Sequence, residues 1–85
     1  ARRPAKYEVP VVEATPLADH RLRLRFDDGF TGEVDVAALV PFEGCFAALA
    51  EPEYFACVRV NPDTGTIEWP NRADIDPFVL RQNAR

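Results

Sequence analysis

One stretch of alternating side chains, residues 20–26, constrains the fold of this chain more than any other feature. Polar and apolar residues alternate there with a period of two, which predicts a half-buried β-strand. The turn sequence Asp27-Asp28-Gly29 follows and predicts a hairpin. A two-residue turn would place Leu24 opposite a glutamate, whereas a three-residue loop with the glycine in the left-handed region places Leu22 opposite Val34. We therefore predict the three-residue loop, because it keeps apolar side chains on one face.

The polar face of this strand carries Arg21, Arg23 and Arg25, which could bind phosphate groups. Residues 1–25 hold six basic residues against three acidic ones, whereas the rest of the chain is acidic. The hairpin register places Arg23 opposite Glu33 and Arg21 opposite Asp35, which favours a face neutralised by cross-strand ion pairs. Nucleic-acid binding is therefore the alternative function, through the basic N-terminal residues Arg2, Arg3, Lys6, Arg21, Arg23 and Arg25.

The remaining sequence indicates short strands, turns and short helices. A second hairpin is expected, in which residues 57–60 pair with residues 67–69 around the turn Pro62-Asp63-Thr64-Gly65. Asp76-Pro77 predicts the N-cap and first residue of a helix. The other expected elements are a strand at 7–15, a turn at 16–19, helical turns at 37–40, 44–50 and 51–55, and a C-terminal helix at 78–82.

These elements predict an α+β fold: a single small domain in which antiparallel β-hairpins form one twisted sheet, with short helices on one face. Within residues 1–85 we expect a flexible leader at 1–6, a core at 7–80 and a frayed C-terminus at 81–85. No apolar run approaches the length of a transmembrane helix, so we expect no membrane association.

The residue types present exclude several kinds of active site. There is no serine and only one histidine, His20, so a serine nucleophile or a multi-histidine site cannot be built from this chain. His20 is expected to be exposed or paired with Asp19, and most aspartates fall at turn tips or caps. We therefore expect no enzymatic activity, no cofactor and no metal. Cys45 and Cys57 lack a CxxC spacing and are expected to be buried thiols of a cytoplasmic protein.

Aromatic side chains are numerous for so small a core. Trp69 and Tyr54 would form a protein-binding anchor if they were partly exposed together. The interpretation that we favour for Trp69 alone is that it is the largest core residue. The candidate partner-binding residues are Trp69, Tyr54, Phe42 and Asn71. Edge-strand residues 9–15 offer a second route, by extending the sheet across a homodimer.

Several short motifs match one known family in order and spacing. They are Leu22-x-Leu24-x-Phe26-Asp27-Asp28-Gly29, Gly32-x-Val34-Asp35-Val36, Gly44-x-Phe46-x-x-Leu49, Phe55 before Val58-x-Val60, Ile67-x-Trp69-Pro70-Asn71 and Ala73-Asp74-Ile75-Asp76-Pro77. Over residues 9 to 80, the chain resembles the bacterial family called domain of unknown function 2442. The resemblance implies a small α+β domain without an established activity. Arg72 stands where many relatives have glycine, which argues against a tight, glycine-dependent turn at that point.

The same resemblance implies a small protein encoded nearby as a partner, since a toxin–antitoxin role has been suggested for such pairs. We therefore expect a non-enzymatic protein-interaction domain. Its partner would be a small toxin–antitoxin-like protein or a second copy of the same chain. Binding of nucleic acid remains the alternative.

Overall fold

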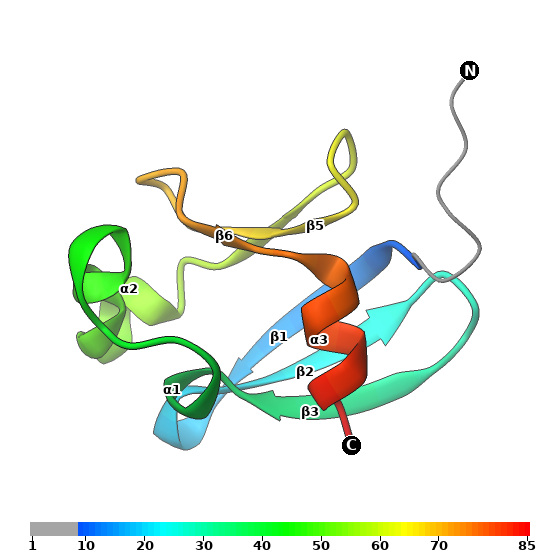
Figure 1. Ribbon diagram of the computed structural model, residues 1–85, viewed down its shortest axis with the longest axis horizontal. Coiled ribbons are helices and arrows are strands. Elements are labelled where there is room, and N and C mark those ends of the chain that lie inside the picture. The colour runs from blue at the N-terminus through cyan, green and yellow to red at the C-terminus, as the bar shows by residue number, and fades with distance from the viewer. Residues whose placement is uncertain (1–8) are drawn as a thin grey trace.

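The computed structural model describes residues 9–85 and places the two expected hairpins in separate three-stranded sheets (Figure 1). The first sheet has the order β1-β2-β3, with strands Val11–Leu17, Arg21–Phe26 and Thr31–Asp35. The second has the order β4-β5-β6, with strands Arg59–Asn61, Thr66–Glu68 and Asp74–Ile75. All neighbouring strands are antiparallel. The α+β class is confirmed, with two sheets in place of the single sheet expected.

Five short helical elements accompany the strands in residues 9–85. They are η1 at Ala18–His20, α1 at Val36–Leu39, η2 at Gly44–Ala50, α2 at Pro52–Phe55 and α3 at Pro77–Asn83. Three of them, α1, η2 and α2, separate the two sheets along the sequence. The segment from α1 to α2 gathers at one end of the molecule, which we call the helical end, and α3 lies across the front (Figure 1). Because this segment intervenes between β3 and β4, the second hairpin pairs with β6 and starts a sheet of its own.

The predicted register of the first hairpin is confirmed. Leu22 pairs with Val34, and the Phe26 amide donates to the Phe30 carbonyl at 2.9 Å. Gly29 has the expected left-handed backbone, with φ at 90°. Side chains alternate between exposed and buried along all of β2, so the apolar face is fully covered.

The second hairpin also forms as expected. Arg59 lies opposite Glu68 and Val60 lies opposite Ile67, around the turn at residues 62–65. The Asp76 side chain accepts a hydrogen bond from the Phe78 amide at 2.7 Å, which confirms the predicted cap of α3. Strand β6 was not expected, because two residues are too few for alternation to reveal a strand.

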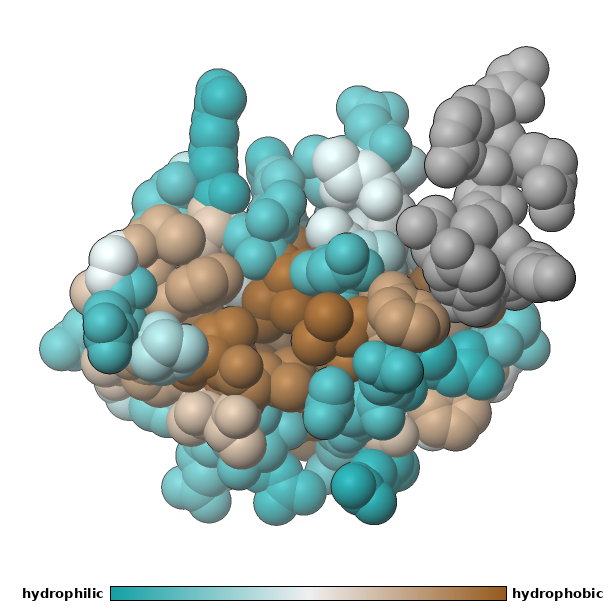
Figure 2. All heavy atoms as spheres, in the orientation of Figure 1, coloured by the Kyte–Doolittle hydropathy of each residue, from teal (hydrophilic) through white to brown (hydrophobic). Residues whose placement is uncertain are grey.

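The core lies between the two sheets. Its buried apolar residues are Val11, Leu22, Leu24, Phe26, Val34, Val36, Leu49, Phe55, Ile67, Trp69, Ala73, Ile75 and Leu80. Figure 2 shows apolar residues along the middle of one face, with polar residues above and below them. Among the large apolar side chains of residues 9–85, Val79 is the exposed one, at 37%. The core is therefore thin but well covered, as expected for a chain of this length.

Strand β1 continues to Leu17, through the turn expected at residues 16–19. The backbone groups of Glu33 bond to Arg85 and therefore face away from β2. Because hydrogen-bonded and non-hydrogen-bonded pairs alternate along antiparallel strands, the nitrogen of Pro16 then faces the outer edge of β1. A proline is tolerated there because no ladder hydrogen bond is lost. A register shift between Val11 and Glu13 further distorts this edge. Both features hinder the pairing of β1 with a second copy, which we expected for residues 9–15.

The C-terminal residues are held by helix α3 and by hydrogen bonds to β3. The expectation that residues 81–85 fray is therefore corrected. Helix α3 runs to Asn83, and Arg85 exchanges two backbone hydrogen bonds with Glu33 on β3. Gly32 allows this approach, since a Cβ there would lie 3.1 Å from the Arg85 nitrogen. The expected leader at residues 1–6, and the first two residues of the expected core, lie outside the described residues.

The turn after Trp69 forms without glycine. Arg72 adopts φ of 71°, a left-handed backbone that glycine adopts without strain. The Arg72 amide donates to the Trp69 carbonyl at 2.8 Å, so the tight turn closes. The argument from Arg72 against a tight turn at this point is therefore corrected.

A strained histidine turn beside an apolar cavity

The three arginines of β2 are paired with carboxylates, as expected, although Arg21 and Arg23 share Glu33 and Arg21 does not bind its predicted partner Asp35. Arg21 Nη2 lies 2.9 Å from Glu33 Oε1, and Arg23 Nη2 lies 3.3 Å from Glu33 Oε2. Arg25 Nε lies 3.0 Å from Glu13 Oε1 on β1, and this donation holds the pKa of the Glu13 carboxyl below its usual range. Arg21 therefore bonds diagonally to the longer Glu33 side chain, although its register partner is Asp35.

These ion pairs disfavour a phosphate-binding face on β2, because each of its three guanidinium groups already has a carboxylate partner. The other basic residues of that hypothesis, Arg2, Arg3 and Lys6, lie outside the described residues.

Trp69 belongs to the core and not to an exposed anchor. Its side chain is 1% exposed, and its indole N–H donates to the Phe55 carbonyl at 2.9 Å. Trp69 directly follows β5, and its large ring lies in the core, where burial stabilises it most. The hypothesis that Trp69 contacts a partner is corrected, and the core interpretation is confirmed.

Tyr54 and Asn71 hold the loop after Trp69 against the helical end. The Asn71 amide donates to the Tyr54 hydroxyl at 2.8 Å, and its side-chain amide donates to the Cys45 carbonyl at 2.9 Å. Its side-chain oxygen accepts from the Ala73 amide at 3.1 Å. These contacts give Tyr54 and Asn71 a structural role, and their contact with a partner stays a prediction.

The turn between β1 and β2 is strained. Asp19 and His20 are consecutive, neither is glycine, and both have left-handed backbones, with φ of 61° and 59°. A non-glycine residue in this region costs about 1–3 kcal/mol, and such residues cluster at functional sites. From the sequence we expected a turn at residues 16–19 but not this pair of left-handed residues, although aspartate and histidine adopt the region more often than most residue types.

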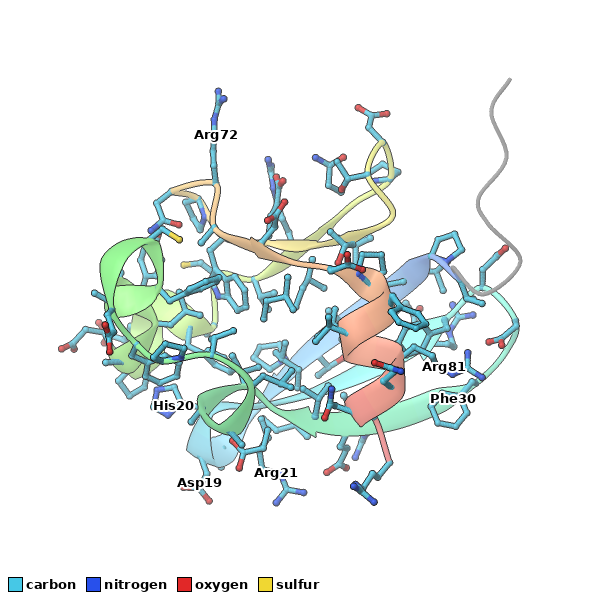
Figure 3. All side chains as sticks on the ribbon, viewed as in Figure 1. Asp19, His20, Arg21, Phe30, Arg72 and Arg81 are labelled. Atoms are coloured by element: carbon cyan, nitrogen blue, oxygen red, sulfur yellow. The ribbon has the colours of Figure 1, made fainter. Side chains whose placement is uncertain are left out.

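Packing at the helical end holds His20 in place (Figure 3). Its ring lies 5.1 Å from the ring of Phe42 and 5.1 Å from that of Phe55, centroid to centroid. Its Nε2 donates to the Ala50 carbonyl at 3.2 Å. The Asp19 side chain instead points outward from the turn, away from the His20 ring (Figure 3). His20 is thus neither exposed nor paired with Asp19, and Phe42 serves to hold the histidine ring.

A cavity of about 320 Å³ lies directly beside this turn. Its walls are the turn residues 18–20, the end of β1, and α2 with the residue that follows it. The side chains that line it outside the turn are mostly apolar: Pro16, Leu17, Pro52, Phe55 and Ala56. A volume of this order is at the small end of ligand sites. We call it the His20 cavity.

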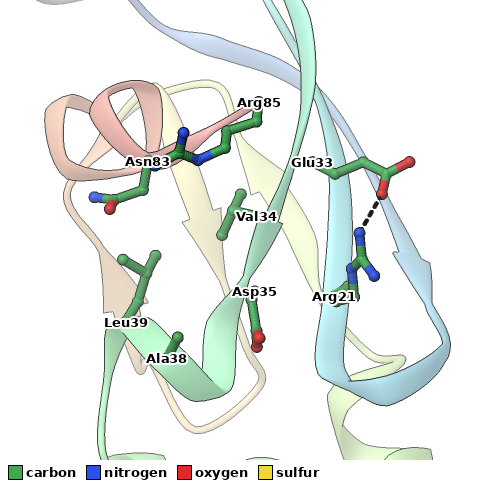
Figure 4. Close-up of a pocket in the computed structure, with 8 residues that line it drawn as sticks. All are labelled: Arg21, Glu33, Val34, Asp35, Ala38, Leu39, Asn83 and Arg85. Carbon is green, nitrogen blue, oxygen red and sulfur yellow. Dashed lines mark hydrogen bonds and ion pairs between the residues drawn. The ribbon is translucent and has the colours of Figure 1, made fainter.

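A second cavity of about 420 Å³ opens at the edge of β3 (Figure 4). It has both cationic and anionic walls, from Arg21, Arg85, Glu33 and Asp35. Arg21 and Glu33 bind each other, which leaves the cavity without a dominant charge or an apolar character. It therefore gives a weaker case for a binding site than the His20 cavity.

The remaining chemistry-bearing groups do not converge. In residues 9–85, no three His, Cys, Asp or Glu side chains are placed to hold a metal ion. Cys45 and Cys57 are exposed free thiols, which corrects the expectation that they are buried. They are exposed because each lies on a short helix or turn at the surface. Within the described part of the chain, no helix is long and apolar enough to cross a membrane.

Comparison with protein families now adds one finding. Residues 11–85 match the family model described as "Protein of unknown function (DUF2442)". The chain belongs to the DUF2442 family. The match covers both sheets, the helical end and α3, so every element that builds the His20 cavity belongs to the DUF2442 domain. Comparison with the curated proteins and with the solved structures found no match.

Proposed function

We propose that this DUF2442 domain is a non-enzymatic protein-interaction module that holds an apolar side chain of its partner in the His20 cavity. The observation that carries the proposal is the coincidence of a doubly left-handed turn with an apolar cavity that the same turn lines. Backbone strain of this kind persists only where surrounding packing fixes it, and it is typical of binding sites. From the family resemblance we further propose that the partner is a small protein encoded nearby, of the toxin–antitoxin type.

Three features support an apolar side chain as the occupant. The cavity is lined mostly by carbon atoms of Pro16, Leu17, Pro52 and Phe55, and its volume suits one side chain better than a cofactor. The His20 ring donates its Nε2 hydrogen to the Ala50 carbonyl, which holds the ring as a fixed wall of the cavity. A pocket that receives one anchoring side chain is the usual centre of a protein interface.

Peptide selection tests this function. A library of short random peptides is panned against the full chain and counter-selected against Ala56→Trp, which fills the cavity from an exposed wall residue. The matched control is Ala47→Trp, an exposed alanine of η2 outside the cavity. We expect enriched peptides with a shared apolar residue that bind the wild type and Ala47→Trp and fail to bind Ala56→Trp. Peptides that bind all three proteins equally, or no enrichment, contradict the proposal.

A further inference from the structure

The chain has a long segment without any basic residue. No Lys or Arg occurs between Arg25 and Arg59, and this segment includes the whole helical end. The same segment carries seven carboxylates, at Asp27, Asp28, Glu33, Asp35, Glu43, Glu51 and Glu53. Three of these carboxylates, Glu43, Glu51 and Glu53, lie in the helical end, which has no basic residue and is therefore anionic.

Three of the chain's carboxylates lie at or next to the His20 cavity. Asp19 lines it, and Glu51 and Glu53 flank Pro52, which also lines it. All three residues are exposed. Within residues 9–85 none of them takes part in an ion pair. We call these residues the acidic rim.

The arginine next to the turn, Arg21, and the first arginine after the helical end, Arg59, are each bound to a glutamate outside this rim. Arg21, which follows the turn directly, is bound to Glu33 on β3. The basic side chains of the second sheet, Arg59 among them, follow the helical end, and Arg59 binds Glu68. An apolar cavity with an anionic border attracts cations, and this attraction increases the rate and the selectivity of binding.

We propose that the partner segment of the His20 cavity is basic: an apolar side chain flanked by Lys or Arg residues that contact the acidic rim. This inference rests on the proposed function and specifies the chemistry of its partner. A second copy of the chain is a poorer occupant, because two molecules of charge -4 repel each other and their rims would face like charges. The inference therefore separates a basic heterologous partner from the homodimer.

Three synthetic peptides test the proposal against the ¹⁵N-labelled 85-residue chain. All have a central leucine: acetyl-Lys-Lys-Gly-Leu-Gly-Lys-Lys-amide and its Gln and Glu counterparts. Amide chemical shifts report both the affinity and the place of binding. We expect the Lys peptide to shift residues 17–20 and 53–56 and to bind about tenfold more tightly than the Gln peptide, since each exposed charge pair contributes modestly. The difference should shrink at high salt.

Matched variants separate the rim from general charge attraction. Asp19→Asn/Glu51→Gln/Glu53→Gln should lower the affinity for the Lys peptide to that for the Gln peptide. Asp27→Asn/Asp63→Asn/Asp74→Asn removes the same charge away from the cavity and should leave the affinity for the Lys peptide within about twofold. Ala56→Trp should abolish binding of all three peptides, with Ala47→Trp as its control.

Each outcome decides between the two proposals. Equal affinity for the Lys and Gln peptides, with loss in Ala56→Trp, overturns the basic partner and leaves the proposed function standing. Absence of any localised shift with all three peptides overturns both. Light scattering completes the test: a dimer that Ala56→Trp dissociates means that a second copy fills the cavity, which also overturns the basic partner.

Discussion

Glu33 and Arg85 exchange two backbone hydrogen bonds, of 2.9 and 3.0 Å, so the last residue of the sequence extends the first sheet. Gly32 makes this contact sterically feasible. A Cβ at residue 32 would lie 3.1 Å from the Ala84 Cβ and 3.0 Å from the Phe30 ring. The pairing of Arg85 with the edge of β3 therefore requires glycine at residue 32.

Gly32→Val is expected to displace residues 84 and 85 and to lower the free energy of unfolding by about 1–3 kcal/mol, since overpacking a close contact costs this much. Hydrogen exchange of the Glu33 amide checks the mechanism, because its partner is the Arg85 carbonyl. Thr31→Val on the same strand is exposed and serves as the control. An unchanged exchange rate at Glu33 in Gly32→Val would contradict the prediction.

Arg72→Gly is expected to stabilise the protein by about 0.5–1 kcal/mol, because it removes the strain of a left-handed residue at a smaller cost in chain entropy. The evidence is the φ of 71° at Arg72. Arg72→Ala removes the same side chain and keeps the strain, so it should change stability little. Urea unfolding of both variants measures the difference, and equal midpoints would refute the prediction.

The Arg81 guanidinium fastens α3 to the tip of the first hairpin. Its carbon lies 4.2 Å from the Phe30 ring centroid and 5.3 Å from that of Phe26, and Nη1 lies 2.7 Å from Asp28 Oδ2. Arg81→Gln should lower the free energy of unfolding by about 1–2 kcal/mol, and Arg81→Lys should recover only part of it because lysine lacks the planar group. Thermal unfolding checks the expected order of stability, which is wild type, then Arg81→Lys, then Arg81→Gln. A lysine variant as stable as wild type would argue against stacking of the guanidinium on the rings.

Acid should weaken the fold through carboxyls that are bound in the native state. The Arg81 side chain and the Phe30 amide donate to Asp28, and the Asn61 and Arg59 side chains donate to Glu68, so the pKa of each carboxyl is lowered. A lowered native pKa gives stability that is present above the unfolded value, about 4, and lost as pH falls through the native value.

Melting temperature should therefore drop as pH falls below about 4. The double variant Asp28→Asn/Glu68→Gln should be less stable than wild type at neutral pH and should lose less stability in acid. Parallel pH profiles for the two proteins would show that these carboxyls do not contribute.

The two left-handed residues at the His20 turn should respond in opposite ways. His20→Ala keeps the strained backbone and removes the ring contacts with Phe42 and Phe55, so we expect a loss of about 1–3 kcal/mol. Asp19→Gly relieves strain at an exposed side chain and should raise stability by about 0.5–1 kcal/mol. Denaturant midpoints measure both changes. Equal signs for the two substitutions would be incompatible with the strain described.

The sequence predicts the parts of this fold that are set locally. Alternation along β2 and the position of Gly29 determine the register of the first hairpin, and Asp76-Pro77 determines the start of α3. What it does not predict depends on distant contacts. His20 keeps its left-handed backbone through rings at residues 42 and 55, and β6 exists only because Ile75 pairs with Ile67.

The candidate site was missed for the same reason. Trp69 and Tyr54 are conspicuous residue types, but the former is buried and the latter binds a loop amide. The His20 cavity is lined by alanine, proline and leucine side chains of ordinary kinds, and it forms only when β1 and α2 meet.

The order of the strands has a consequence for how the chain folds. In each sheet the strands neighbour one another in sequence, so most pairing closes short loops, which favours rapid folding. The Val11–Gly65 and Glu33–Arg85 hydrogen bonds are different, because each joins distant parts of the chain. During synthesis the two meanders can therefore form in turn, whereas the outer edge of β3 stays open until Arg85 has emerged from the ribosome.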